Sequence, residues 1–275
     1  MKGKIMKVIN PKVEIIPRMP PLKKIELCGR VCYKSEDKIT EDSAEKFVRK
    51  LVEREHTSVL EHARVIVTAR AIVPKCMCYG VLDRITYVPG INQIAVNGRD
   101  LLKINGSVDE LANSPVADDY MSVRFTCDRA IANELVRHRV FSFSQCSTRY
   151  VNLKGGIEVI APIPFSWAPD DYDSFRVAAA DPRYQAWFFS CEYAERSYHT
   201  LIEEGCTPQE ARTVLPMSTK TELIMTGTYP QWKEMLKLRM AKAAHPQMRY
   251  LMKLLVENPD FPNDKIKVEV TYDNP

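Results

Sequence analysis

Strand-like and helical patterns follow one another in an irregular order along this chain, and that order most limits the folds open to it. Thr40 to Glu55 has a helical period, behind the capping candidates Thr40 and Ser43. Its apolar side holds Ala44, Phe47, Val48 and Leu51. Two β-rich stretches follow, at His62 to Val73 and at Met121 to Cys127.

Further helices are expected in the second half. Asp128 is a natural N-cap for a helix to about Arg139 that buries Ile131 and Leu135. A long helix fits Tyr184 to Glu204 and stops at Gly205. Thr207-Pro208-Gln209-Glu210 begins a helix that ends before Pro216, and a last one runs from about His245 to Glu257. This irregular alternation predicts an α+β fold rather than a doubly wound sheet.

The chain reads as a single domain over residues 1–275. It has no internal repeat and no Gly/Ser linker, and its 45% hydrophobic content is enough for one substantial core. Residues 74–118 contain many turn signals, and their pattern assigns no secure element.

Composition excludes several classes of protein. A net charge of +4, from 39 basic and 35 acidic side chains, gives no broad positive field, so no stable nucleic-acid partner is expected. No apolar run approaches the roughly 20 residues that cross a bilayer, and the basic N-terminus breaks at Asn10-Pro11 before a signal-peptide core develops. We therefore expect no membrane partner and a cytoplasmic location. The eight cysteines are expected to be reduced, mostly buried thiols that bind no metal.

The polar residues best suited to bind a ligand or to take part in catalysis lie in one segment, from Arg137 to Tyr150. It opens with Arg137-His138-Arg139, and Glu134 lies where it could share a helix face with Arg137 and His138. Arginine forks suit phosphate oxygens, while hydroxyl and amide groups suit the edge of a base. Cations at a helix C-terminus can simply complement its dipole, but that reading does not explain so many polar groups in 14 residues. The chain has no G-x-G-x-x-G turn, so a dinucleotide would not be held in a Rossmann fold.

Four blocks of sequence resemble the flavin-dependent thymidylate synthases, in that family's order. Arg137-His138-Arg139, seven residues and Ser147 resemble its R-H-R-x7-S signature, and Thr148-Arg149-Tyr150 continues the likeness. Upstream, His56 to His62 resembles H-x-[ST]-x-x-E-H. Downstream, Glu210 to Pro216 resembles E-x-A-R-x-x-L-P, and Trp232 to Arg239 with Ala244 to Arg249 resembles the C-terminal stretch.

The resemblance implies a mainly antiparallel sheet flanked by long helices, in a homotetramer with composite active sites. It implies methylation of dUMP to dTMP with FAD as cofactor and with methylenetetrahydrofolate and NADPH as co-substrates. Reduced flavin would deliver hydride to the uracil ring after carbon transfer, without an enzyme nucleophile. The implied flavin contacts are His56, Ser58, Arg137, His138, Arg139, Gln145, Lys237 and Arg239. The implied dUMP contacts are Glu134, Arg137, Gln145, Ser147, Thr148, Arg149 and Arg249, of which Arg249 would act catalytically by favouring the ionised uracil.

Some positions depart from the family pattern. Glu222 stands where many relatives have an arginine, and Lys237 and Ala243 replace Asn or His near the flavin. Residues 74–118 exceed the shortest relatives and form a possible insertion. Two other readings stay open: a nucleotide- or RNA-binding module that uses the R-H-R segment without turnover, and an inactive relative, which Glu222 would favour.

Overall fold

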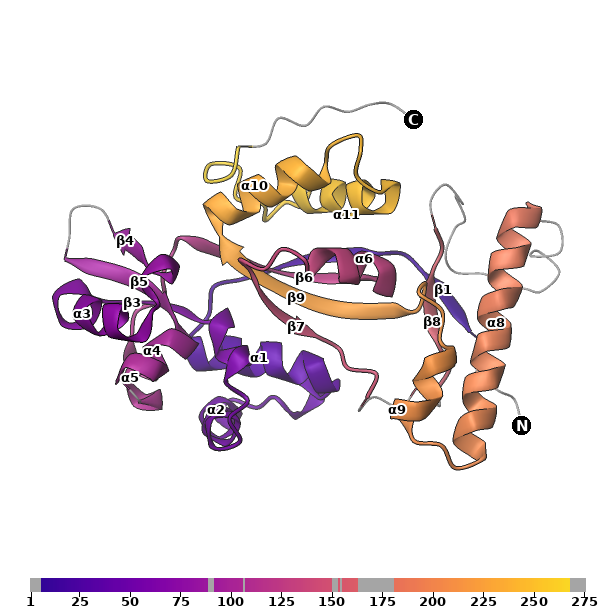
Figure 1. Cartoon of the computed structure of the whole chain (residues 1–275), viewed down its shortest axis with the longest axis horizontal. Helices are drawn as coiled ribbons and strands as arrows, with labels where there is room; N and C mark the ends of the chain where they lie inside the picture. The colour runs from indigo at the N-terminus through magenta and orange to yellow at the C-terminus, as the bar shows by residue number, and fades with distance from the viewer. Residues whose placement is uncertain are drawn as a thin grey trace.

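A central four-stranded antiparallel sheet organises the molecule. The computed structural model describes residues 6–88, 92–105, 107–149, 153, 155–162 and 181–267, with only the backbone at Ala71 and Asn105. The strands lie in the order β2 (Lys12–Ile16), β6 (Tyr120–Asp128), β9 (Lys220–Thr228) and β7 (Ser142–Gln145). Every neighbouring pair is antiparallel. With helices on both faces (Figure 1), this sheet confirms the predicted α+β class.

The sheet is buried on both faces because each face carries its own helices. On one face, α6 (Arg129–Leu135), α10 (Tyr229–Arg239) and α11 (Pro246–Val256) pack in one apolar cluster with Leu223 and Met225. Trp232 is fully buried there and donates its indole N–H to the Met121 carbonyl at 3.0 Å. On the other face, α1 (Pro21–Tyr33) covers Ile224. Consecutive β9 residues therefore alternate between two cores.

A smaller three-stranded sheet forms one end of the molecule, drawn at the left of Figure 1. Its order is β3 (Arg64–Thr68), β5 (Gln93–Asn97) and β4 (Thr86–Val88). Its largest cluster of buried side chains joins it to the nearby helices. These are α2 (Ser43–Glu53), η2 (Thr57–His62), α3 (Ala69–Tyr79), α4 (Gly98–Asn105) and α5 (Val108–Asn113), with η3 (Leu82–Arg84) as a further short turn. After α1, the short turn η1 (Glu36–Lys38) lies by the central sheet, where Glu36 pairs with Arg124.

The opposite end is built around α8 (Pro182–Glu203), beside the parallel pair β1 (Lys7–Ile9) and β8 (Glu158–Ile160). The buried Glu195 carboxylate accepts hydrogen bonds from the Met6 and Ile157 amides at 3.0 and 2.7 Å, which ties both segments to α8. The chain then turns at Gly205, whose φ is 92°, into α9 (Pro208–Ala211) and η4 (Arg212–Val214).

Most predicted elements are present, and the differences have physical causes. The long helix ending before Gly205, the Thr207–Glu210 capping box and the last helix are confirmed. The strand expected through Val73 ends at Thr68, because Ala69, Ile72 and Cys76 bury one face at helical spacing.

Two helix boundaries were predicted wrongly. The helix expected from Thr40 begins at Ser43 with Asp42 as N-cap, and the Ser43 hydroxyl instead accepts the Thr40 amide at 2.8 Å. Asp128 caps α6 as predicted, accepting from the Ile131 amide at 2.8 Å, but the helix ends at Leu135 rather than Arg139. The chain must turn there to bring Phe141 against Trp232, with ring centroids 5.0 Å apart, before it enters β7.

All eight cysteines are free thiols, and five of them are buried. Within the described residues, no helix has the length and apolarity needed to cross a bilayer.

Candidate functional site

The signature begins in the turn between α6 and β7, where three predicted site residues come together. Arg239 of α10 donates to His138 Nε2 at 2.8 Å and to the Glu134 carboxylate at 2.9 Å. Its remaining nitrogen donates to the Glu134 carbonyl at 3.1 Å. Burial and the positive Arg239 lower the pKa of His138, which favours the neutral imidazole.

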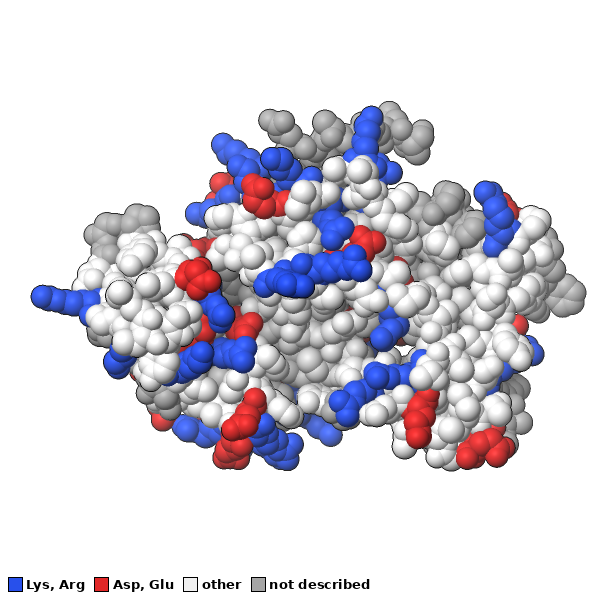
Figure 2. All heavy atoms as spheres, in the orientation of Figure 1, with Lys and Arg blue, Asp and Glu red and all other residues white. Residues whose placement is uncertain are grey.

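The predicted helix face shared by Glu134, Arg137 and His138 does not form, because α6 ends before Arg137. Glu134 and His138 still meet, but through Arg239 from another helix rather than through helical spacing. Arg137 and Arg139 are exposed on the turn. Figure 2 shows basic side chains over α6 in the middle of this face, above a hollow in the surface.

The second half of the signature follows β7 and is fixed by backbone contacts. The Cys146 amide donates to the Glu222 carbonyl at 2.8 Å, and the Ser147 amide donates to the Cys32 carbonyl of α1 at 3.0 Å. The Gln145 side-chain amide donates to the Thr221 hydroxyl at 3.3 Å. These contacts hold Gln145 and Ser147 between β9 and α1.

Thr148 and Arg149 connect the signature to other elements. The buried Thr148 hydroxyl accepts from Arg129 at 3.4 Å, and the exposed Arg149 donates to the Gln209 side chain of α9 at 2.9 Å. Tyr150, the last residue of the resemblance at the signature, lies outside the described residues.

Sequence reasoning missed Arg129, which donates to the Thr148 hydroxyl. Burial and the positive Arg212 lower the pKa of Arg129. A partly buried cation beside a hydroxyl favours an anion. A signal existed, because Arg129 is the first residue of α6 and a cation at a helix N-terminus opposes the dipole. A cation at this unfavourable position indicates a role other than stabilising the helix.

The upstream block forms η2, which lies beside β7. His62 is fully buried, with Nδ1 2.7 Å from the Thr226 hydroxyl, and burial lowers its pKa to about 3. Glu61 accepts from the Ser142 hydroxyl at 3.1 Å and pairs with Arg99 at 2.7 Å. His56 and Ser58, the predicted flavin contacts, are exposed at the start of η2.

Arg249 lies on the second turn of α11. Its Nε is buried and has no hydrogen-bond partner among the described residues. Gln247, two residues earlier, donates to Asp128, the N-cap of α6, so α11 is fastened to the start of α6. Lys237 of α10 and Ala243 are exposed.

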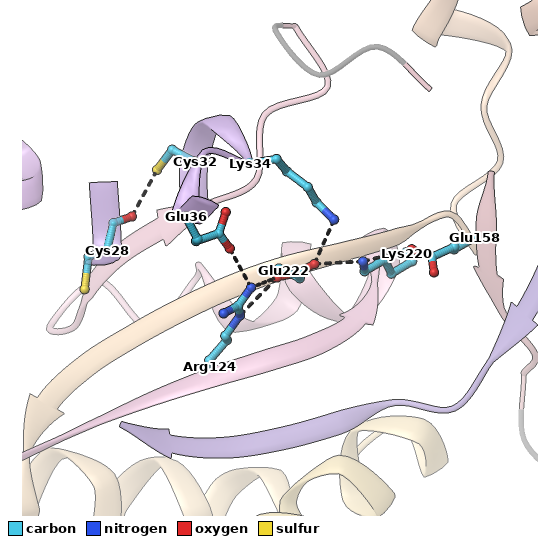
Figure 3. A network of polar contacts seen from close by, with 8 residues as sticks. All are labelled: Cys28, Cys32, Lys34, Glu36, Arg124, Glu158, Lys220 and Glu222. Atoms are coloured by element: carbon cyan, nitrogen blue, oxygen red, sulfur yellow. Dashed lines mark hydrogen bonds and ion pairs between the residues drawn. The ribbon is translucent and has the colours of Figure 1, made fainter. Parts of the chain in front are cut away.

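Glu222 occupies the centre of a charge network (Figure 3). Its carboxylate pairs with Lys34 at 2.9 Å, with Lys220 at 2.7 Å and with Arg124 of β6. Glu36 also pairs with Arg124, at 2.8 Å, and Glu158 also pairs with Lys220, at 2.9 Å. Burial alone would raise the pKa of Glu222, but hydrogen bonds from Lys220, Arg124 and Lys34 outweigh it and hold that pKa far below its usual range.

A polar cavity of about 540 Å³ opens next to the signature turn. One wall is Arg139, Val140, Phe141 and Ser142, and the floor includes Thr226, Gly227 and Thr228 at the end of β9. The predicted site residues thus come from the turn before β7, from the end of β7 and the residues after it, and from η2, α10 and α11.

Comparisons with known proteins agree with these motifs. The family model described as thymidylate synthase complementing protein matches residues 14–76 and 94–262. A flavin-dependent thymidylate synthase of Mycolicibacterium gilvum (strain PYR-GCK) is 27% identical over 236 residues, covering 82% of this chain and 70% of the relative. One from Corynebacterium efficiens is 26% identical over 230 residues, with the same coverage.

Among solved structures, the UMP/dUMP methylase PolB from Streptomyces cacaoi, bound with 5-Br UMP, is similar with a TM-score of 0.44 and 17% identity. That likeness covers 90% of this chain and 87% of PolB. The family match spans most of the chain and confirms the resemblance seen in the four sequence blocks. This chain therefore belongs to the thymidylate synthase complementing protein family, whose relatives found here are flavin-dependent thymidylate synthases.

Proposed function

We propose that this protein is a flavin-dependent thymidylate synthase that methylates dUMP to dTMP. In this proposal FAD is the cofactor, methylenetetrahydrofolate donates the carbon and NADPH is the reductant. Beyond family membership, the observation that carries the proposal is Arg129, which donates to the Thr148 hydroxyl of the signature and whose pKa is lowered by burial and by the positive Arg212. A nucleoside monophosphate has a dianionic phosphate that these cations would hold.

The nucleotide would bind along the second half of the signature. Arg129 and Arg212 would take the phosphate together with Arg137 and Arg149. The side chains proposed to line the rest of the dUMP site are Glu134, Gln145, Ser147 and Thr148.

Arg249 is proposed to act on the uracil ring. Its buried Nε–H finds no acceptor in the part of the chain that the structure describes, and buried donors are normally satisfied. A uracil carbonyl would supply the acceptor, and the positive guanidinium would favour the ionised ring.

The flavin would be held by His56, Ser58, Arg137, His138, Arg139, Gln145, Lys237 and Arg239. The positive Arg139 and the polar cavity beside it suit the phosphates of a dinucleotide, so the residues present fit this cofactor. When bound, the flavin supplies hydride transfer, and the protein supplies position and charge. Following the family resemblance, we propose that these contacts complete a site between subunits of a homotetramer.

No enzyme nucleophile is proposed. Burial raises the pKa of the Cys146 thiol, which keeps it protonated and weakly nucleophilic. The Ser147 hydroxyl accepts from the Arg149 amide at 3.3 Å and is assigned to binding. The buried, low-pKa His62 contacts Thr226 and not the signature serine.

A coupled assay tests the proposal. Purified protein with FAD should oxidise NADPH and release dTMP only when both dUMP and methylenetetrahydrofolate are present, with dTMP measured by liquid chromatography. NADPH oxidation that needs no dUMP, with no dTMP formed, would refute it. Salt-sensitive RNA binding without turnover would favour the binding-module reading instead.

A further inference from the structure

The 540 Å³ cavity has a wall that no sequence motif predicted. Opposite the signature turn it is lined by Asp83, Arg84, Ile85 and Thr86, from η3 and the start of β4. Residues 77–93 lie between the two ranges that the family model matches, so this wall comes from a segment outside the family match. In Figure 2, charged side chains of both signs gather where the end built on β3, β5 and β4 meets the centre of the molecule.

The wall is held in place by a buried arginine. Arg64, at the start of β3, pairs with both Asp119 oxygens at 2.9 and 3.0 Å. It also donates to the Arg84 carbonyl at 3.2 Å and to the Thr86 hydroxyl at 2.5 Å. Because Arg64 is nearly fully buried, it fixes the backbone from which the Arg84 side chain projects.

Charges of both signs line the cavity. Four arginines line it, at positions 64, 84, 99 and 139, together with the two acids Glu61 and Asp83. Arg64 pairs with Asp119 and Arg99 pairs with Glu61 at 2.7 Å. Arg84 and Arg99 have side chains 52% and 44% exposed, and the Arg84 contact with Asp100 is long, at 3.4 Å. Because both guanidinium groups are about half exposed, each can exchange its carboxylate partner for a phosphate group.

We infer that Arg84 and Arg99 bind the phosphates of a dinucleotide whose adenosine diphosphate half occupies this cavity. The inference rests on the proposed function, in which both FAD and NADPH contain that half. The cavity has the volume of sites for ligands of this size. Arginine guanidinium groups fit phosphate oxygens, and Tyr120 and Phe141 add aromatic rings to the lining. Arg84 and Arg99 are thus specificity residues that favour a dinucleotide over a flavin lacking adenosine diphosphate.

Binding measurements on flavin-free protein test this without turnover. Flavin fluorescence would follow FAD and FMN, and calorimetry would follow NADPH and ADP, for the native protein, Arg84→Ala, Arg99→Ala and the double variant. Lys103→Ala is the control, because Lys103 is exposed on α4 one turn after Arg99 and does not line the cavity. Circular dichroism would check that each variant is folded.

The double variant should bind FAD about 10- to 100-fold more weakly, from the loss of charge-assisted hydrogen bonds, while FMN binding and the Lys103→Ala protein stay unchanged. Arg84→Lys should retain part of the affinity. Weaker NADPH binding with unchanged FAD binding would support the same site and assign it to NADPH. Unchanged affinity for FAD, NADPH and ADP in the double variant would overturn the inference.

The proposed function can fail separately. If the native protein binds no flavin, the proposed function is refuted, and the ADP titration then decides the inference alone. ADP binding that is lost in the double variant would uphold the cavity assignment, and no ADP binding to the native protein would refute it.

Discussion

At the scale of single residues, Arg249 has a buried hydrogen-bond donor to which the described residues offer no acceptor. Removing the side chain should therefore break no contact at its Nε within that part of the chain. We predict that Arg249→Ala abolishes most turnover, by 10²-fold or more as for other lost electrostatic stabilisers, while the fold is unchanged. Lys253→Ala, an exposed change one turn later on α11, is the control. Unchanged dTMP formation in Arg249→Ala would remove the residue from its proposed role.

The signature arginines should affect binding more than the chemical step. Losing Arg137 or Arg149 should weaken dUMP binding by about 1.5–3 kcal/mol, the value of a charge-assisted hydrogen bond. Calorimetric titration with dUMP measures this directly. Affinities equal to the native value in both variants would contradict the placement of the phosphate.

His62 makes stability depend on pH. Its pKa is about 3 in the folded protein, while the unfolded chain takes up a proton near pH 6.5. Stability from the neutral ring is therefore complete above pH 6.5 and is lost as pH falls toward 3. Between pH 7 and pH 5 the native protein should lose about 2 kcal/mol relative to His62→Gln, which lacks this titration. Urea unfolding at the two pH values tests this, and parallel losses in both proteins would refute it.

At the scale of elements, the Glu222 network joins the end of α1 to β6 and β9. Removing one partner of a buried ion-pair network leaves the others uncompensated, so Glu222→Gln should destabilise the protein by about 3–5 kcal/mol. Because the folded pKa of Glu222 is depressed, this difference is present above about pH 4.3 and shrinks as pH falls below it. Glu41→Gln, an exposed change of the same chemistry, is the control. Equal unfolding midpoints for Glu222→Gln and the native protein at pH 7 would show that the network adds no stability.

Local signals predicted elements where tertiary contacts agreed with them. The Thr207–Glu210 capping box and the Asp128 cap are local hydrogen-bond motifs and were predictable. The helix at Ala69–Tyr79 was not predictable, because Ile72 and Val73 favour a strand and Pro74 favours a break in a helix. Only packing against the shared core favours a helix there.

In the candidate site, too, local features were predictable and tertiary contacts were not. Residues of the signature could be named from sequence because they are close together along the chain. The approach of Arg212 to Arg129 and the bridge from Arg239 to Glu134 join positions 83 and 105 apart, and no local pattern encodes them. The network that explains Glu222 is equally non-local, since it joins Lys34, Arg124 and Lys220.

At the scale of the whole molecule, the account requires assembly. Light scattering after size exclusion should give about four times the 31.5 kDa mass of one chain. Mixing two variants altered at different positions, Arg249→Ala impaired in turnover and Arg149→Ala impaired in dUMP binding, should raise turnover at low dUMP above that of either variant alone if subunits share sites. A monomer with full activity would contradict the composite site.

The central claim is that this molecule is a flavoenzyme acting on dUMP, and its visible absorbance spectrum tests that most directly. The purified protein, supplied with FAD if it is colourless, should show a protein-bound flavin spectrum that bleaches when NADPH and dUMP are added. A folded protein that takes up no flavin would contradict the account.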